Sequence, residues 1–102
     1  MPIAEDSRSL KFNFGVTEAA YRNGNATDGV EFAILDLRLE PENQEIFRRL
    51  LDPMNVVSDQ GLQNMEIDLT ASGEGELILL TRPGPNGNTS WDWSYWGNVT
   101  IE

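Results

Sequence analysis

The residues best suited to chemistry in this sequence are aromatic side chains near its C-terminal end. All three tryptophans and one of the two tyrosines lie between Trp91 and Trp96. In an extended segment Trp91, Trp93 and Tyr95 point to one side, because successive side chains of a strand alternate. An aromatic row of this kind can stack on the weakly apolar faces of pyranose rings. The spacing therefore predicts a carbohydrate-binding strip.

Polar side chains ahead of the aromatic row could bond the hydroxyl groups of such a sugar. The candidates are Asn86, Asn88 and Arg82, which lie in or beside a loop rich in proline, glycine and asparagine. Two other interpretations stay open. In one, the loop is only a rigid connection. In the other, Trp93 and Trp96 are anchors of the hydrophobic core.

Two aspartates, Asp28 and Asp92, lie in or beside turns. Calcium prefers carboxylate and carbonyl oxygens, which these residues and the carbonyls around Asn86 could supply. The simpler interpretation is that both side chains bond backbone amides within their turns. A structural calcium site is therefore kept as an alternative, and no other cofactor is expected.

Composition excludes several kinds of function. The chain of 102 residues contains no cysteine and no histidine, which removes disulfides, thiolate or imidazole metal sites and Ser-His-Asp catalysis. The net charge of −10 disfavours nucleic acid and anionic membrane as partners. Acidic pairs such as Glu40 with Glu42, and Glu74 with Glu76, flank turns rather than a cleft. We therefore expect no enzymatic activity.

The elements that must position the aromatic row are expected to be short strands. Apolar and polar residues alternate along 10–16, and further strands are expected at 30–39, 65–69, 77–81 and 95–101. The alternation changes phase near Ile34 and Leu35, which indicates a β-bulge or a strand buried on both faces. Short strands separated by Gly/Asn/Pro turns predict an antiparallel β-sandwich.

Two segments are harder to assign. Apolar residues within 41–52 have helical spacing between two prolines, so the pattern alone favours a short helix there. Residues 1–9 are polar and are expected to form a flexible N-terminal segment. The remainder, 10–102, is expected to be a single sandwich domain.

An ordered set of motifs resembles a known family. These are Phe12-x-Phe14-Gly15, Asp28-Gly29-Val30-x-Phe32, Glu45-Ile46-Phe47, Met65-x-Ile67-Asp68-Leu69, Pro83-Gly84-Pro85-Asn86-Gly87-Asn88 and Asp92-Trp93-x-x-Trp96-Gly97. The set resembles the NPCBM-like carbohydrate-binding modules, which are galactose-binding-like jelly rolls. The resemblance implies a jelly-roll topology, a strand instead of a helix at 45–51, and a structural role for Trp96.

The resemblance also implies a function and a setting. Modules of this kind are non-catalytic accessory domains of larger bacterial proteins, which suggests an extracytoplasmic or membrane-associated parent and a glycan as the partner. The alternative is a structural or protein-interaction sandwich without sugar binding, in which the aromatic row is buried in the core or in a homodimer contact.

Overall fold

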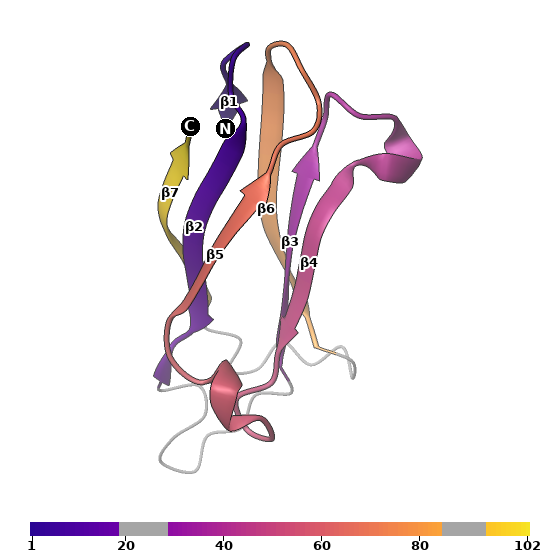
Figure 1. The fold of residues 1–102 in the computed structure, drawn as a ribbon. Helices are drawn as coiled ribbons and strands as arrows, with labels where there is room; N and C mark the ends of the chain where they lie inside the picture. Colours follow the sequence, from indigo (N-terminus) through magenta and orange to yellow (C-terminus); the bar gives the residue numbers. More distant parts are fainter. Residues whose placement is uncertain (19–28, 85–93) are drawn as a thin grey trace.

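The structure, a computed structural model, describes residues 1–18, 29–84 and 94–102. Within these residues the chain forms strands joined by turns and two short 3-10 helices, shown in Figure 1. The strands are β1 (Pro2–Ile3), β2 (Ser9–Val16), β3 (Val30–Asp36), β4 (Glu45–Leu51), β5 (Gln63–Asp68), β6 (Gly75–Pro83) and β7 (Ser94–Ile101). The 3-10 helices are η2 (Pro41–Asn43) and η3 (Val57–Asp59).

The strands form two antiparallel sheets that pack face to face. One sheet has the order β1-β6-β3-β4 and the other the order β5-β2-β7 (Figure 1). Every strand pair in both sheets is antiparallel. The predicted all-β, two-sheet antiparallel sandwich is therefore confirmed, whereas the finer jelly-roll assignment stays a prediction.

The alternation along β2 determines which of its faces enters the core. Leu10, Phe12, Phe14 and Val16 are at most 3% exposed, so this strand supplies a continuous apolar row to the interior. Burial of each such side chain contributes on the order of 1.5–3 kcal/mol relative to exposure. The residues between them, Lys11, Asn13 and Gly15, belong to the outer face of the same sheet.

An aromatic cluster joins the two sheets. Phe12, Phe14 and Trp96 come from the three-stranded sheet, and Phe32 and Phe47 from the four-stranded sheet. Their ring centroids lie 5.0–5.8 Å apart, in tilted or edge-to-face arrangements. These are the distances and geometries that aromatic pairs prefer. Trp96 thus occupies the core position that the resemblance implied.

The segment with helical spacing is a strand. β4 pairs with β3 along Glu45–Leu51, and only η2, at its N-terminal side, is helical. The strand that the resemblance implied at 45–51 is therefore present, and the helix that periodicity alone favoured is wrong, because pairing with β3 and contact of Phe47 with the aromatic cluster outweigh local periodicity. The register of the β3–β4 pair shifts between Ile34 and Leu35, at the position where the alternation was expected to change phase.

The N-terminal segment is part of the fold. It was expected to be flexible, but β1 pairs with Gly75 and Glu76 of β6, and Ile3 is only 3% exposed. The backbone of Arg8 and Ser9 also donates hydrogen bonds to the carbonyl of Glu102. A single buried isoleucine and a few backbone bonds are enough to dock this short polar stretch.

A buried ion pair holds the turn after β3. The Arg38 side chain donates to both carboxylate oxygens of Asp36, at 2.9 and 2.7 Å, and to the carbonyl of Gly73. Both side chains are at most 5% exposed. The Arg38 hydrogen bonds lower the pKa of Asp36 against the opposing effect of burial. The pair therefore stays ionised and connects two turns at one end of the sandwich.

Candidate functional site

Most of the residues predicted to form the site lie outside the described residues. These are Trp91, Trp93, Asn86 and Asn88 of the carbohydrate strip, and Asp28 and Asp92 of the calcium alternative. Arg82 and Tyr95 are described, and they do not share a surface. Arg82 is on β6 in the four-stranded sheet, whereas Tyr95 is on β7 in the other sheet.

Arg82 is engaged in ion pairs on the outer face of the four-stranded sheet. Its guanidinium lies 2.6 Å from a carboxylate oxygen of Glu31 and 3.7 Å from one of Glu45. The hydrogen bond with Glu31 is the main cause of the raised pKa of Arg82. Because β3 and β4 each supply an acid to it, Arg82 has little charge left for a ligand.

Tyr95 lies on the outer face of the three-stranded sheet, against a glycine. It is the register partner of Gly15, and a Cβ atom at Gly15 would collide with the phenol hydroxyl and lie 2.7 Å from Cζ. The tyrosine ring therefore extends from β7 across β2, and the absence of a side chain at Gly15 makes room for it. The tyrosine remains 36% exposed, which leaves aromatic surface available to a ligand.

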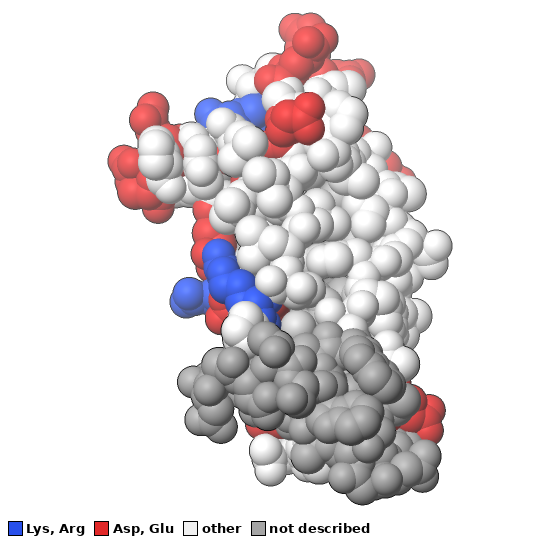
Figure 2. Space-filling view, turned by 180° about the vertical axis from the view of Figure 1, so that it is seen from behind, with Lys and Arg blue, Asp and Glu red and all other residues white. Residues whose placement is uncertain are grey.

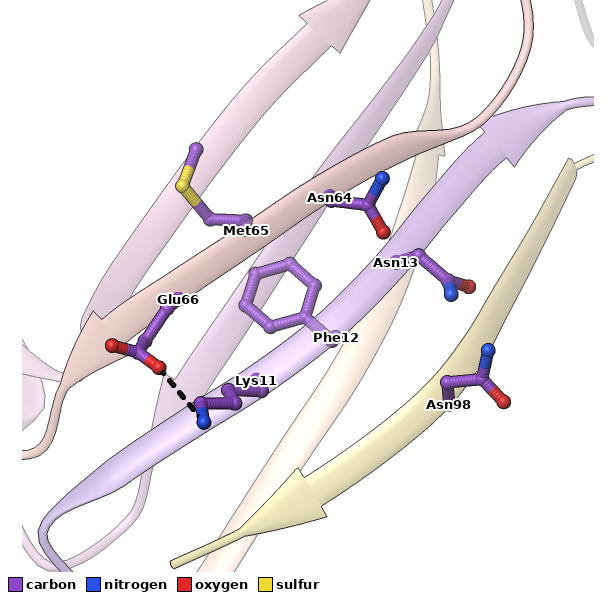
Figure 3. A pocket seen from close by; sticks show the side chains of 7 residues that line it. All are labelled: Lys11, Phe12, Asn13, Asn64, Met65, Glu66 and Asn98. Atoms are coloured by element: carbon purple, nitrogen blue, oxygen red, sulfur yellow. Dashed lines mark ion pairs between the residues drawn. The ribbon is translucent and has the colours of Figure 1, made fainter.

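Around Asn13, two residues along β2 from Gly15, the outer face holds an open depression of about 410 Å³ (Figure 3). Tyr95 is not one of the residues that line it. The polar side chains of the depression come from all three strands, with Asn13 of β2 paired directly with Asn64 of β5. The next outward pair along the two strands is Lys11 with Glu66. The lining residues are Lys11, Phe12, Asn13, Asn64, Met65, Glu66 and Asn98.

A bulge in β7 supplies the third asparagine. Lys11 pairs with Thr100 and Asn13 with Gly97, so Asn98 and Val99 together oppose the one intervening residue of β2. Asn98 has a φ of +46°, a left-handed conformation that asparagine adopts more readily than most residues. The extra residue lets Val99 pack against the core while Asn98 lines the depression.

Asn13 is the most enclosed polar group of this site. It is only 7% exposed, and its Oδ1 lies over Gly97, where a Cβ atom would collide with it. Among the residues that the structure describes, none forms a hydrogen bond with its side-chain amide. Asn13 is buried as a residue, but its amide nitrogen and oxygen keep some contact with solvent. Among the described residues, the buried side-chain polar atom without a partner is Nε1 of Trp96. The Asn13 amide is therefore a candidate ligand-binding group.

The charged residues at one end of the depression nearly neutralise one another. The Lys11 ammonium lies 3.4 Å from Glu66 and 3.2 Å from Glu102. The hydrogen bond and attraction of Glu102 raise the pKa of Lys11, with a smaller contribution from Glu66. With two carboxylates around one ammonium, this end of the depression does not attract anions.

Sequence analysis missed this asparagine face, although the sequence carries a weak signal for it. Asn13 interrupts an otherwise favourable strand pattern, and Gly97 and Asn98 do the same near the end of the chain. Asparagine and glycine are depleted in strands, so their presence within strands calls for a reason. Only the pairing of β5, β2 and β7 reveals that these residues and Asn64 face one depression.

Comparisons with known proteins add one relative. The chain is 34% identical over 77 residues to an uncharacterized protein of Archaeoglobus fulgidus, a match that covers 74% of the chain. The chain spans only 19% of the length of that protein. No protein family and no solved structure matches the chain. The resemblance to the NPCBM-like modules therefore stays a prediction.

The described residues contain neither a membrane-spanning helix nor a cluster of metal-binding side chains. No helix there is long and apolar enough to cross a membrane. Those residues also contain no group of three or more acidic side chains arranged to hold a metal ion. The two aspartates of the calcium alternative lie outside the described ranges, so that alternative stays untested.

Proposed function

We propose that this protein is a non-catalytic carbohydrate-binding module whose site is the outer face of the β5-β2-β7 sheet. The observation that carries the proposal is a set of three asparagines, Asn13, Asn64 and Asn98, which come from three neighbouring strands and line one depression. Tyr95, one position further along the sheet, adds an exposed aromatic surface. The predicted Trp91, Trp93, Asn86, Asn88 and Arg82 are not needed for this site.

The chemistry of the face suits a neutral polyhydroxylated ligand. Each asparagine amide offers two N–H donors and a carbonyl acceptor, which matches hydroxyl groups that both donate and accept. The tyrosine ring can cover the apolar C–H face of a sugar. The paired charges of Lys11, Glu66 and Glu102 favour a neutral sugar over a sulfated or carboxylated one.

Binding rather than catalysis is the role that the described residues support best. A retaining or inverting glycosidase needs two carboxyl groups facing one cleft at a defined separation. The depression has one acidic side chain among its lining residues, Glu66, and it is paired with Lys11. We place the module in a larger protein that it would tether to glycan, in an extracytoplasmic or membrane-associated setting.

NMR titration of the side-chain amides tests the proposal directly. The NH₂ resonances of Asn13, Asn64 and Asn98 can be assigned from single substitutions and followed as neutral oligosaccharides are added. We expect at least one β- or α-linked neutral oligosaccharide to shift the Asn13 signals, and an anionic oligosaccharide such as oligogalacturonate to leave them unchanged. Failure of a broad neutral panel at millimolar concentration to move these signals would refute the proposal.

Two substitutions locate the binding energy. Asn64→Ala and Tyr95→Ala should each weaken binding of the active oligosaccharide by about tenfold, the effect of losing one contact of roughly 1.4 kcal/mol. Asn43→Ala is the matched control, because Asn43 is exposed in η2 and outside the depression. Equal weakening by Asn43→Ala and Asn64→Ala would place the sugar elsewhere.

The second expectation, a protein-interaction sandwich, placed the aromatic row of Trp91, Trp93 and Tyr95 in the core or in a homodimer contact. A different surface of the described residues favours a protein partner. The side of the sandwich along β6 and β7 is broad and mostly uncharged in Figure 2, in a chain whose net charge is −10. Charge depletion of this kind is typical of the centres of protein interfaces.

A further inference from the structure

The inner face of the four-stranded sheet is covered along β3 but not along β6. Phe32 and Ile34 of β3 are both 0% exposed. Their register partners on β6 are Thr81 and Leu79, which point to the same face. Thr81 is exposed and Leu79 is only partly buried, whereas Leu77 at the other end of the row is 1% exposed. The interior therefore opens progressively along β6.

The offset between the two sheets explains this opening. Phe32 of β3 contacts both Phe14 of β2 and Trp96 of β7, with ring centroids 5.0 and 5.3 Å apart. β3 thus lies above the β2–β7 pair, and β6 extends beyond β7. Among the described residues no strand pairs with the second edge of β7. Within the described ranges, no strand therefore occupies the position beside β7 and opposite β6.

We call this position the β7 slot and define it by Leu79, Thr81, Trp96 and Val99. Leu79, Trp96 and Val99 are partly buried apolar residues that pack against the core. An added strand beside β7 would place its inward side chains against these residues.

The composition of β7 differs from that of the other long edge strands. β4 contains Glu45 and two arginines, and β5 contains Glu66 and Asp68, but Ser94–Ile101 contains no charged residue. Charges on an edge strand discourage pairing with another chain, and natural sheets use them for that purpose. The edge of β7 lacks this protection, as expected of an edge that receives a partner.

We propose that the β7 slot binds one extended peptide segment, which pairs with β7 and completes the sheet. The segment carries apolar side chains at alternate positions, to cover Leu79 and Trp96, and no acidic residue, since the chain has a net charge of −10. A folded second copy paired through its own β7 fits less well, because the overhanging β6 of each copy would occupy the same space.

A peptide that copies residues 9–16 of this chain tests the proposal. This segment already pairs antiparallel with the other edge of β7, and its Leu10, Phe12, Phe14 and Val16 are apolar at alternate positions. We expect it to bind and to slow hydrogen exchange of the β7 amides that do not face β2. A peptide of the same composition, with its order scrambled to remove the alternation, should not bind.

Two threonine substitutions in the full chain supply the matched control. Thr81→Glu places a carboxylate in the slot, and Thr70→Glu adds the same charge at an exposed position just beyond β5, the opposite edge of that sheet. Thr81→Glu should weaken peptide binding at least tenfold, and Thr70→Glu should leave it within twofold. Absent binding, or equal loss in both variants, overturns the proposal. Concentration-dependent dimerisation that Thr81→Glu abolishes would also overturn the proposal, since a second copy of the chain would then fill the slot. The inference does not rest on carbohydrate binding.

Discussion

Replacing Asn13 by valine should stabilise the protein while it removes ligand binding. Asn13 is 7% exposed as a residue, its side chain lines the depression, and no described residue forms a hydrogen bond with its amide. A polar group that is fully buried and unpaired costs about 1–3 kcal/mol, and the Asn13 amide, which keeps some contact with solvent, costs less. Valine is also favoured over asparagine in strands by up to about 1 kcal/mol. Because part of the amide still reaches the depression, we take the lower end and expect a gain of about 1 kcal/mol.

The assay is thermal and urea unfolding of the wild type and two variants. For a domain of this size, about 1 kcal/mol corresponds to a rise in Tm of about 4–8 °C. Asn64→Val is the matched control, because Asn64 is the register partner of Asn13 but is exposed to solvent. Its effect should stay within about 0.5 kcal/mol. A loss of stability of 1 kcal/mol or more in Asn13→Val would show that the amide is already satisfied in the folded protein, and the argument for a ligand would fail.

Three further outcomes are expected. Asp36→Asn should lower the free energy of unfolding by about 3 kcal/mol at pH 7, because it leaves the buried Arg38 guanidinium without its charge partner. The pKa of Asp36 is lowered in the folded state, so this stabilisation is present above the pKa of the unfolded carboxyl. It is lost as the pH falls through the lowered pKa of the folded carboxyl. The free energies of unfolding of the wild type and of Asp36→Asn should therefore converge at low pH. Gly15→Ala should displace the Tyr95 ring and weaken oligosaccharide binding as much as Tyr95→Ala does, and unchanged affinity would contradict the stacking role. Ile3→Ala should cost about 2–4 kcal/mol in urea unfolding, whereas a cost near zero would mean that β1 is not docked in solution.

Local patterns in the sequence were sufficient to predict the sandwich fold and much of its core. The alternation of 10–16 correctly assigns Leu10, Phe12, Phe14 and Val16 to the interior, because a strand turns every second side chain to the same face. The phase change near Ile34 likewise marks the observed register shift. These features depend on the chain next to them and so can be read without a structure.

Features that depend on distant segments were not predictable in this way. Ile46 and Phe47, followed by Leu50 and Leu51, fit helical spacing, and only pairing with β3 makes the segment a strand. β1 is fixed by an edge of β6 more than seventy residues away. Local periodicity carries no information about either partner.

The asparagine face was missed for a related reason. Sequence analysis favoured the dense aromatic cluster, where chemistry is visible within a few residues. The depression instead collects one asparagine from each of three strands, and Asn98 reaches it only through a bulge with a left-handed residue. Neither the strand order nor the bulge is encoded in any short motif.

The aromatic cluster between the sheets affects how the protein unfolds. The strand ladders of the described residues run within each sheet and none crosses between them, so the layers are held together chiefly by side chains. Phe14 and Trp96 from one layer and Phe32 from the other touch in a closed triangle of contacts. Neither layer can loosen without uncovering rings of both, and the two sheets should therefore melt in a single cooperative transition, with the fluorescence of Trp96 following the same curve as the loss of β-structure.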